Sequence, residues 1–376
     1  MTDASNDFLW HVGIVGAGRM GMSIFDYIFT AGLRITWVAG SPEKADELRK
    51  KADKMLKRLF KQGIKSADEV QKLDESIFIT DDYSELAGAD VIIEAVAENA
   101  EIKKTVLTKI FKAAQSSAIV ATNSASIMPS ELSEADIDAR RFFGLHFFFP
   151  VEATGVAELI SNEAFTAQNL KKAGNFARDI GLLTVNQDET NAFLLSALAM
   201  PMAGEAFLLA KRVGFKLANK IASSELLPYG PFYLFDQAGV DATIESCRRC
   251  YGRDLLGGRD RYSQLLCFMK LMADSAAEGD GRPSKFLNGA FEYPHDLEAW
   301  RRQEIFSLDS ELDDENHESL RKRFFELLLG AFLRATQNNL VEPDLLNEAW
   351  KRIAGAVKGP LECVYEGNLP DFKARV

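Results

Sequence analysis

A glycine-rich turn, a histidine and a glutamate are the residues of this chain best suited to chemistry. Gly16-x-Gly18-x-x-Gly21 lies near the N-terminus, and His146 is followed twelve residues later by Glu158. The turn is of the type that binds a dinucleotide. An imidazole beside a carboxylate can accept a proton near neutral pH. A nicotinamide site and a proton acceptor in one domain indicate oxidoreduction of a hydroxyl group.

The turn at Gly16 has the sequence context that dinucleotide binding requires. A short β-branched run, Val12–Val15, predicts a strand before it, and apolar residues through Ile24 and Ile28 predict a helix after it. The three glycines permit the tight bend, the approach of a pyrophosphate and close packing of helix on strand. The helix N-terminus then presents N–H groups to the phosphates. The predicted cofactor residues of this turn are Gly16, Gly18, Arg19, Met20 and Gly21.

The second predicted strand, Leu33–Ala39, lacks the terminal acid that binds the ribose 2′-hydroxyl of NAD in many such domains. Ala39 stands at that cofactor-binding position. Without a carboxylate there, the 2′-phosphate of NADP is no longer repelled, and Ser41 or Lys44 offers it a contact. Three outcomes stay open: NAD bound more weakly, NADP, or no dinucleotide.

Strand and helix patterns alternate over the first half of the chain. After the two strands above, apolar runs predict further strands at 91–96, 118–121, 141–146 and 182–185. This alternation predicts an α/β fold with a parallel, doubly wound sheet, a Rossmann domain over residues 1–188.

From residue 189 onward the patterns are helical, and two stretches resemble each other. Gly230-Pro231 and Gly359-Pro360 each follow a long helical pattern, a linker and a shorter helix. Chance similarity of helix starts is one explanation, and a duplicated helical domain is the other. Duplication predicts a first copy over 189–290, then a linker and a degenerate second copy over 291–376. The apolar face of 324–332 is then expected to pack on the helix over 192–209.

Composition excludes several classes of function. The net charge of −11 disfavours nucleic-acid binding. Basic residues gather between Lys50 and Lys61, either as the solvated face of a helix or as a contact to an anionic cofactor. The acidic N-terminus predicts no signal peptide, and no apolar run is long enough to span a membrane. Four cysteines form no disulfide framework, so we expect a cytoplasmic protein without a metal.

Several further motifs occur in a family-specific order. They are Val12–Gly21, Ala89–Asn99, Ala121-Thr-Asn123, His146-Phe-Phe, Glu158, and Gly230-Pro231 with Asp236. In this order the chain resembles the 3-hydroxyacyl-CoA dehydrogenase family over most of its length. The resemblance implies a dehydrogenase for 3-hydroxyacyl thioesters, carried on coenzyme A or a carrier protein. It also implies that His146 exchanges a proton with the 3-hydroxyl, that Glu158 orients the imidazole, and that Glu94, Glu98 and Asn123 lie on the cofactor side.

Three positions depart from that family pattern. Ala125 replaces a serine, Phe149 replaces an asparagine in His-Phe-Phe-Asn-Pro, and Ser196 replaces a second asparagine. Each lost donor costs about 10²-fold in rate if it stabilised the reacting oxygen. Ser126 and Ser196 are the predicted substitutes. A different substrate, such as a β-hydroxy acid without coenzyme A, explains the changes, and so does a scaffolding homologue with little chemistry.

The resemblance also bears on assembly and on the other histidines. In multifunctional members of the family a second helical copy replaces a dimer contact, so a monomer or a homodimer is expected. A histidine beside three phenylalanines is otherwise typical of a core, and Glu158 is the reason to favour catalysis for His146. His11, His295 and His317 have no such partner and are expected at the surface.

Overall fold

The computed structural model describes residues 9–256, apart from positions 135, 214, 239 and 254, and residues 314–365. Contacts divide the chain after Ala192 into two units. The predicted boundary at residue 188 lies close to this division. The predicted boundary between helical copies at residue 290 and the side chain of His295 lie outside the described residues, and so does the side chain of His317.

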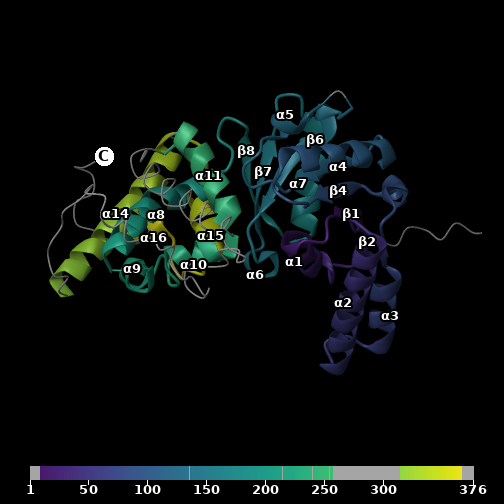
Figure 1. Cartoon of the computed structure of the whole chain (residues 1–376), viewed down its shortest axis with the longest axis horizontal. Coiled ribbons are helices and arrows are strands. Elements are labelled where there is room, and N and C mark those ends of the chain that lie inside the picture. The colour runs from purple at the N-terminus through teal and green to yellow at the C-terminus, as the bar shows by residue number, and fades with distance from the viewer. Residues whose placement is uncertain are drawn as a thin grey trace, which may run out of the picture. The chain divides into compact units, whose positions relative to one another are not determined.

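The first unit is built on one eight-stranded sheet with the order β3-β2-β1-β4-β5-β6-β7-β8 (Figure 1). Its strands are β1 (His11–Val15), β2 (Arg34–Val38), β3 (Ile77–Thr80), β4 (Val91–Glu94), β5 (Ile119–Thr122), β6 (Phe142–Phe147), β7 (Val156–Ser161) and β8 (Leu183–Asp188). All neighbouring pairs are parallel except β6 and β7, which are antiparallel. The predicted Rossmann sheet is confirmed, and the expectation of an all-parallel sheet is wrong at β6–β7.

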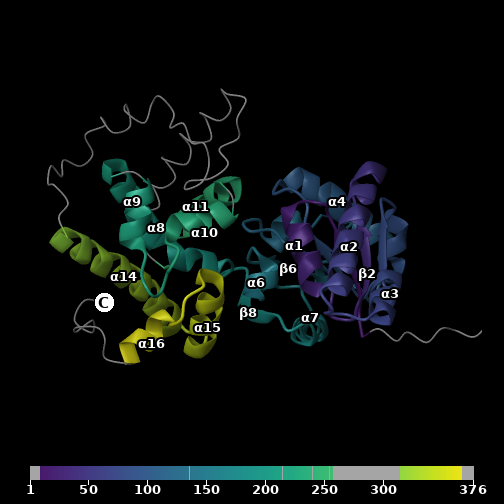
Figure 2. The same ribbon diagram turned by 90° about the horizontal axis from the view of Figure 1, so that it is seen from below.

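Helices cover both faces of this sheet. They are α1 (Arg19–Ile28), α2 (Pro42–Lys61), α3 (Ala67–Glu75), η1 (Tyr83–Gly88), α4 (Ala100–Ala113), α5 (Pro129–Leu132), η2 (Ala139–Arg141), α6 (Val151–Thr154) and α7 (Ala167–Asp179). Successive residues of a central strand enter different apolar clusters: Ile93 packs in the cluster that holds Phe25 of α1, and Ile92 in the one that holds Leu107 of α4. The helices α2 and α3 pair with each other (Figures 1 and 2).

Two strands and one buried histidine were not predicted. The edge strand β3 has four residues and is partly exposed, and β7 is six residues long with a glutamate inside it, so neither has a strong apolar pattern. The expected surface position of His11 is wrong, because its side chain is 7% exposed at the start of β1. Its Nε2 lies 2.8 Å from Thr36 Oγ1, and burial lowers the pKa of the imidazole.

The second unit is helical over its described residues (Figure 2). Its helices are α8 (Leu194–Val213), α9 (Phe215–Ala222), α10 (Pro231–Ala238), α11 (Val240–Arg253), α14 (Asp314–Gln337), α15 (Pro343–Ala354) and α16 (Pro360–Tyr365). As predicted, α14 packs on α8; Phe324, Leu328 and Phe332 of α14 are buried, and Arg323 pairs with Glu205 at 2.7 Å. No helix in the described ranges is long and apolar enough to cross a membrane.

The two Gly-Pro sites share one local structure. In α9, Asn219 Oδ1 accepts a hydrogen bond from the N–H of Phe232 at 3.0 Å. In α15, Asn347 Oδ1 accepts from the N–H of Leu361 at 3.1 Å. A Cβ atom on Gly230 or on Gly359 would lie 2.3 Å from the Oδ1 of its asparagine. We therefore propose that α8–α10 and α14–α16 are two copies of one helical motif, each locked by an asparagine.

Replacing Asn347 tests this lock. Asn347→Ala removes the acceptor for a buried N–H, so the free energy of unfolding should fall by about 1–3 kcal/mol. Denaturant unfolding followed by circular dichroism measures the change. Asn338→Ala, at an exposed asparagine, is the control and should leave stability unchanged. Equal stabilities of the two variants would contradict a structural role for Asn347.

Candidate active site

The glycine turn has the geometry of a dinucleotide site. Gly16, directly after β1, has a φ of +124°, a region that favours glycine. A Cβ on Gly21 would lie 2.2 Å from the carbonyl oxygen of Gly16, so helix and turn approach too closely for any side chain. A Cβ on Gly18 would meet nothing within 4 Å. The first and third glycines are therefore required by the fold, and the second borders open space at the N-terminus of α1.

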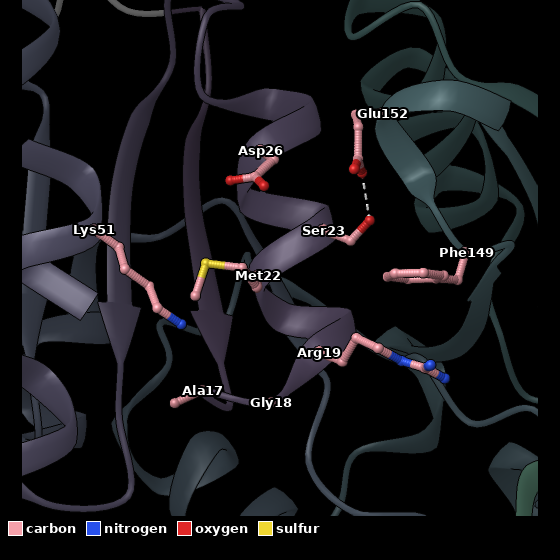
Figure 3. Close-up of a pocket in the computed structure, with 9 residues that line it drawn as sticks. All are labelled: Ala17, Gly18, Arg19, Met22, Ser23, Asp26, Lys51, Phe149 and Glu152. Atoms are coloured by element: carbon pink, nitrogen blue, oxygen red, sulfur yellow. Dashed lines mark hydrogen bonds between the residues drawn. The ribbon is translucent and has the colours of Figure 1, made fainter. Parts of the chain in front are cut away.

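A cavity of about 310 Å³ opens beside this turn (Figure 3). It is lined by Ala17, Gly18, Arg19, Met22, Ser23, Asp26, Lys51, Phe149 and Glu152. The guanidinium carbon of Arg19 lies 4.6 Å from the centre of the Phe149 ring, a cation–π contact. Lys51, from the basic cluster of α2, faces the same cavity, where it attracts the carboxylate of Asp26.

His146 and Glu158 form a buried pair across β6 and β7. The antiparallel register sets the two residues directly opposite each other. His146 Nδ1 lies 2.8 Å from Glu158 Oε2, and the exposed fractions of the two residues are 7% and 0%. The predicted contact is confirmed. An ionised carboxylate only accepts hydrogen bonds, so in the tautomer that suits this contact the imidazole donates from Nδ1.

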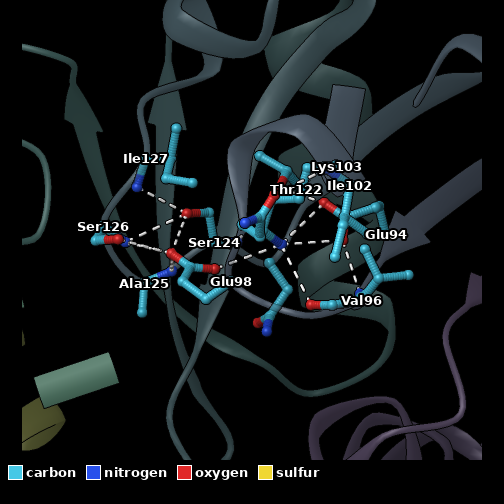
Figure 4. A network of polar contacts seen from close by, with 12 residues as sticks. Glu94, Val96, Glu98, Ile102, Lys103, Thr122, Ser124, Ala125, Ser126 and Ile127 are labelled. Atoms are coloured by element: carbon cyan, nitrogen blue, oxygen red, sulfur yellow. Dashed lines mark hydrogen bonds and ion pairs between the residues drawn. The ribbon is translucent and has the colours of Figure 1, made fainter. Parts of the chain in front are cut away.

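The loop after β5 folds around the carboxylate of Glu98 (Figure 4). Glu98 Oε1 accepts four hydrogen bonds, from the hydroxyls of Ser124 and Ser126 at 2.5 and 2.7 Å and from the N–H groups of Ala125 and Ser126 at 3.1 Å. Burial opposes the charge, but Lys103, the two hydroxyls and His146 outweigh it and lower the pKa of Glu98. The loop therefore has a fixed anion at its centre.

Glu94 and Lys103 form a second part of this network. Lys103 Nζ lies 3.0 and 3.2 Å from the two carboxylate oxygens of Glu94 and 3.4 Å from Glu98 Oε2. Glu94 also accepts from Thr122 Oγ1 at 2.6 Å and from the N–H of Val96 at 2.7 Å. Glu94 is 0% exposed and its oxygens bond to groups inside the domain, and its expected place on the cofactor side stays a prediction.

Other predicted site residues are placed as follows. Asn123 Oδ1 accepts from the N–H of Phe147 at 3.0 Å and so ties the end of β5 to the end of β6. Met20 is partly buried against the core beside the glycine turn. Ala39 is 2% exposed in the same apolar cluster, and the exposed residue at the end of β2 is Gly40. Ser41 Oγ caps α2 by accepting from the N–H of Lys44.

The two serines proposed as substitutes lie in different settings. Ser126 has no exposed surface and donates its hydroxyl to Glu98; its role toward a substrate stays a prediction. Ser196 is partly buried in α8 of the second unit, and its place beside His146 stays a prediction.

Lys103 is the member of this charge network that sequence reasoning missed. It is 1% exposed and lies on the buried stripe of α4 with Leu107 and Ile110. A lysine at an apolar position of an amphipathic helix was the available signal, because a buried ammonium requires an anionic partner. In the described parts of the chain, no group of three or more side chains is arranged to hold a metal.

Asp26, in the cavity beside the glycine turn, makes stability depend on pH. Burial, and then repulsion by Glu152, raise the pKa of Asp26 to about 6, against the attraction of Lys51. A carboxyl whose folded pKa exceeds its unfolded value destabilises the fold as pH rises, and the penalty is complete above pH 6. Asp26→Asn should therefore stabilise the protein by about 1 kcal/mol at pH 8, after allowance for solvent screening, and by almost nothing at pH 4.

Thermal unfolding at the two pH values measures this difference. The control is Asp81→Asn, at an exposed acid outside the cavity. A gain for Asp26→Asn that is the same at pH 4 and pH 8 would contradict the assignment.

Comparison with known proteins agrees with this architecture. Residues 11–190 match the family model described as 3-hydroxyacyl-CoA dehydrogenase, NAD binding domain. The mitochondrial hydroxyacyl-coenzyme A dehydrogenase of Rattus norvegicus is 29% identical over 244 residues, which cover 62% of this chain and 77% of the relative.

Solved structures extend the likeness in fold. A 3-hydroxybutyryl-CoA dehydrogenase from Escherichia coli aligns with a TM-score of 0.67 at 16% identity, over 95% of this chain and 91% of the other. The (S)-3-hydroxybutyryl-CoA dehydrogenase of Ralstonia eutropha aligns with a TM-score of 0.59 at 25% identity, over 71% and 94%. Over its residues 11–190, the chain is therefore similar to the NAD-binding domain of the 3-hydroxyacyl-CoA dehydrogenases.

Proposed function

We propose that this protein is a nicotinamide-dependent oxidoreductase that interconverts 3-hydroxyacyl and 3-oxoacyl thioesters. The observation that carries the proposal is the His146–Glu158 pair, held at 2.8 Å. The pair lies at the carboxyl-terminal end of the parallel strands, where β1, β4 and β5 also end. His146 is near the end of β6, and Glu158 is near the start of the antiparallel strand β7, so both are at this end of the sheet. The names of the relatives support an acyl group carried on coenzyme A.

His146 supplies the acid–base step in this proposal. A bound nicotinamide supplies the acceptor for the hydride that leaves C3. As the C3–H bond breaks, His146 Nε2 takes the proton of the 3-hydroxyl, and a 3-oxo group forms. Glu158 stabilises the imidazolium through the bond at Nδ1. In reduction the same imidazolium returns the proton to the oxygen.

The cofactor is NAD in this proposal, with weak discrimination against NADP. The end of β2 carries Ala39, Gly40 and Ser41 in place of an acid. No carboxylate therefore binds a ribose hydroxyl or repels a 2′-phosphate at that strand end. Arg19 and the open space at Gly18 support binding of the pyrophosphate.

A nucleotide-binding homologue without turnover is the second candidate. The observation that favours it is the loss of donors near the reacting oxygen: Ala125 and Phe149 carry none, and Ser126 is buried against Glu98. This candidate predicts binding of NADH without reduction of acetoacetyl-CoA. A cytoplasmic, reducing location is proposed with either candidate, since the four cysteines of the sequence form no disulfide framework.

Loss of the imidazole should abolish most turnover. In His146→Gln, kcat for acetoacetyl-CoA reduction should fall by at least about 10²-fold, as expected for a general acid, while NADH affinity stays the same. Glu158→Gln should cause a smaller fall. Glu163→Gln, an exposed acid just after β7, is the matched control and should keep full activity. Full activity of His146→Gln would remove the catalytic assignment.

An acid at the end of β2 should restore preference for NAD. Gly40 is exposed and has open space around it, so Gly40→Asp adds a carboxylate where Ala39→Asp would bury one. The ratio of NADPH to NADH dissociation constants should rise about tenfold or more, the equivalent of one hydrogen bond to a charged group. Fluorescence titration measures both constants.

The control for this variant adds the same charge elsewhere. Gln62→Asp lies at the far end of the 20-residue helix α2 and should leave the ratio unchanged. An unchanged ratio in Gly40→Asp would mean that the ribose does not lie at this strand end.

A further inference from the structure

The carboxylate of Glu158 has a second partner besides His146. Gln187 Nε2 donates to Glu158 Oε1 at 3.1 Å, while Oε2 of the same carboxylate contacts the imidazole. Glu158 is 0% exposed and Gln187 is 7% exposed, so the chain from amide to carboxylate to imidazole is shielded from solvent.

The sheet places these three side chains in one row. His146 pairs with Glu158 across β6 and β7, and Gln187 pairs with Ile160 across β7 and β8. Since alternate residues of a strand share a face, Glu158 and Ile160 lie on one face, and Gln187 therefore lies there too. The three strands are neighbours in the sheet (Figure 1). Because β7 lies between β6 and β8, Gln187 and His146 lie on opposite sides of Glu158.

The orientation of the Gln187 amide follows from its neighbour. A carboxylate accepts hydrogen bonds, so the amide must turn its NH₂ group toward Glu158. Among the described residues, its own Oε1 is then buried without a hydrogen-bond partner. The reverse orientation would set two acceptors against each other. The backbone is fixed as well, because Ser161 Oγ donates to the carbonyl oxygen of Gln187 at 3.3 Å.

We infer that Gln187 is a positioning residue for the His146–Glu158 pair, an inference that rests on the proposed function. By holding Oε1, Gln187 fixes the rotation of the carboxylate and keeps Oε2 aligned with Nδ1 of His146. The imidazole then keeps its Nδ1–H form and presents the Nε2 lone pair to the substrate hydroxyl. Gln187 touches neither the substrate nor the cofactor in this role.

The test replaces the amide by an apolar side chain of similar length. Gln187→Met should lower kcat for acetoacetyl-CoA reduction about tenfold and leave KM for both substrates within about twofold, as expected for loss of an outer partner. Asn186→Met, at the exposed neighbouring position of β8, is the matched control and should keep full activity. Thermal unfolding of each variant checks that the fold is retained.

A double-mutant cycle separates positioning from general damage. If Gln187 acts through Glu158, adding Gln187→Met to Glu158→Gln should cause no further loss of kcat. Fully additive losses, an unchanged kcat in Gln187→Met, or an equal loss in Asn186→Met would overturn the inference.

A measurement that needs no turnover keeps this result distinct from the proposed function. In ¹⁵N-labelled protein the ring nitrogens of His146 report which of them carries the proton. The parent should show the Nδ1–H form, and Gln187→Met should show a mixture of both forms. If the parent lacks activity but the tautomer changes, the positioning role stands and the proposed function fails. If the tautomer is the same in both proteins, the positioning role fails.

Discussion

The antiparallel pairing of β6 with β7 is the constraint on which the candidate site depends. It sets His146 directly opposite Glu158, and a slip of one residue would send one of the two side chains to the other face of the sheet. Gly144 permits the close approach of the two strands here, because a Cβ there would lie 3.1 Å from Cβ of its partner Ile160. The geometry of the His146–Glu158 pair thus belongs to the sheet and not to a loop, which is the more rigid arrangement.

A network of buried charges lies at the same end of the sheet as the His146–Glu158 pair. Glu94, Lys103 and Glu98 join the end of β4, the helix α4 and the loop after β5. Removing charges from water is costly, and it is offset here by an ammonium between two carboxylates and by hydroxyl and N–H donors to both of them. Because each member depends on the others, the small-residue loop from Ser124 to Ser126 has one arrangement.

Side-chain contacts connect the glycine turn and α1 with the segment after β6. Arg19, at the first position of α1, lies over the ring of Phe149. Ser23 of the same helix donates to Glu152 at 2.5 Å and accepts from the N–H of Val151 at 2.8 Å. The proposed pyrophosphate site and the strand end that carries His146 are therefore linked through α1 and α6. This end of the sheet has fewer polar side chains than the family pattern, because Ala125 and Phe149 stand in place of a serine and an asparagine. The proposed chemistry therefore depends more heavily on the His146–Glu158 pair.

The sequence by itself was sufficient for six of the eight strands, the glycine turn and the His146–Glu158 contact. β-Branched runs and glycine spacing are local signals that predict strands and the turn. The pair of His146 and Glu158, which are distant in sequence, was predicted from the family-specific order of motifs. Only the tertiary structure decided which polar groups are buried. His11 and Ser126 lie in the interior, Glu94 pairs with Lys103, and β7 runs antiparallel to β6. The reason is physical. Whether a carboxylate or hydroxyl meets a ligand or an internal partner depends on strand direction and on residues far away in the chain, and a local pattern contains neither.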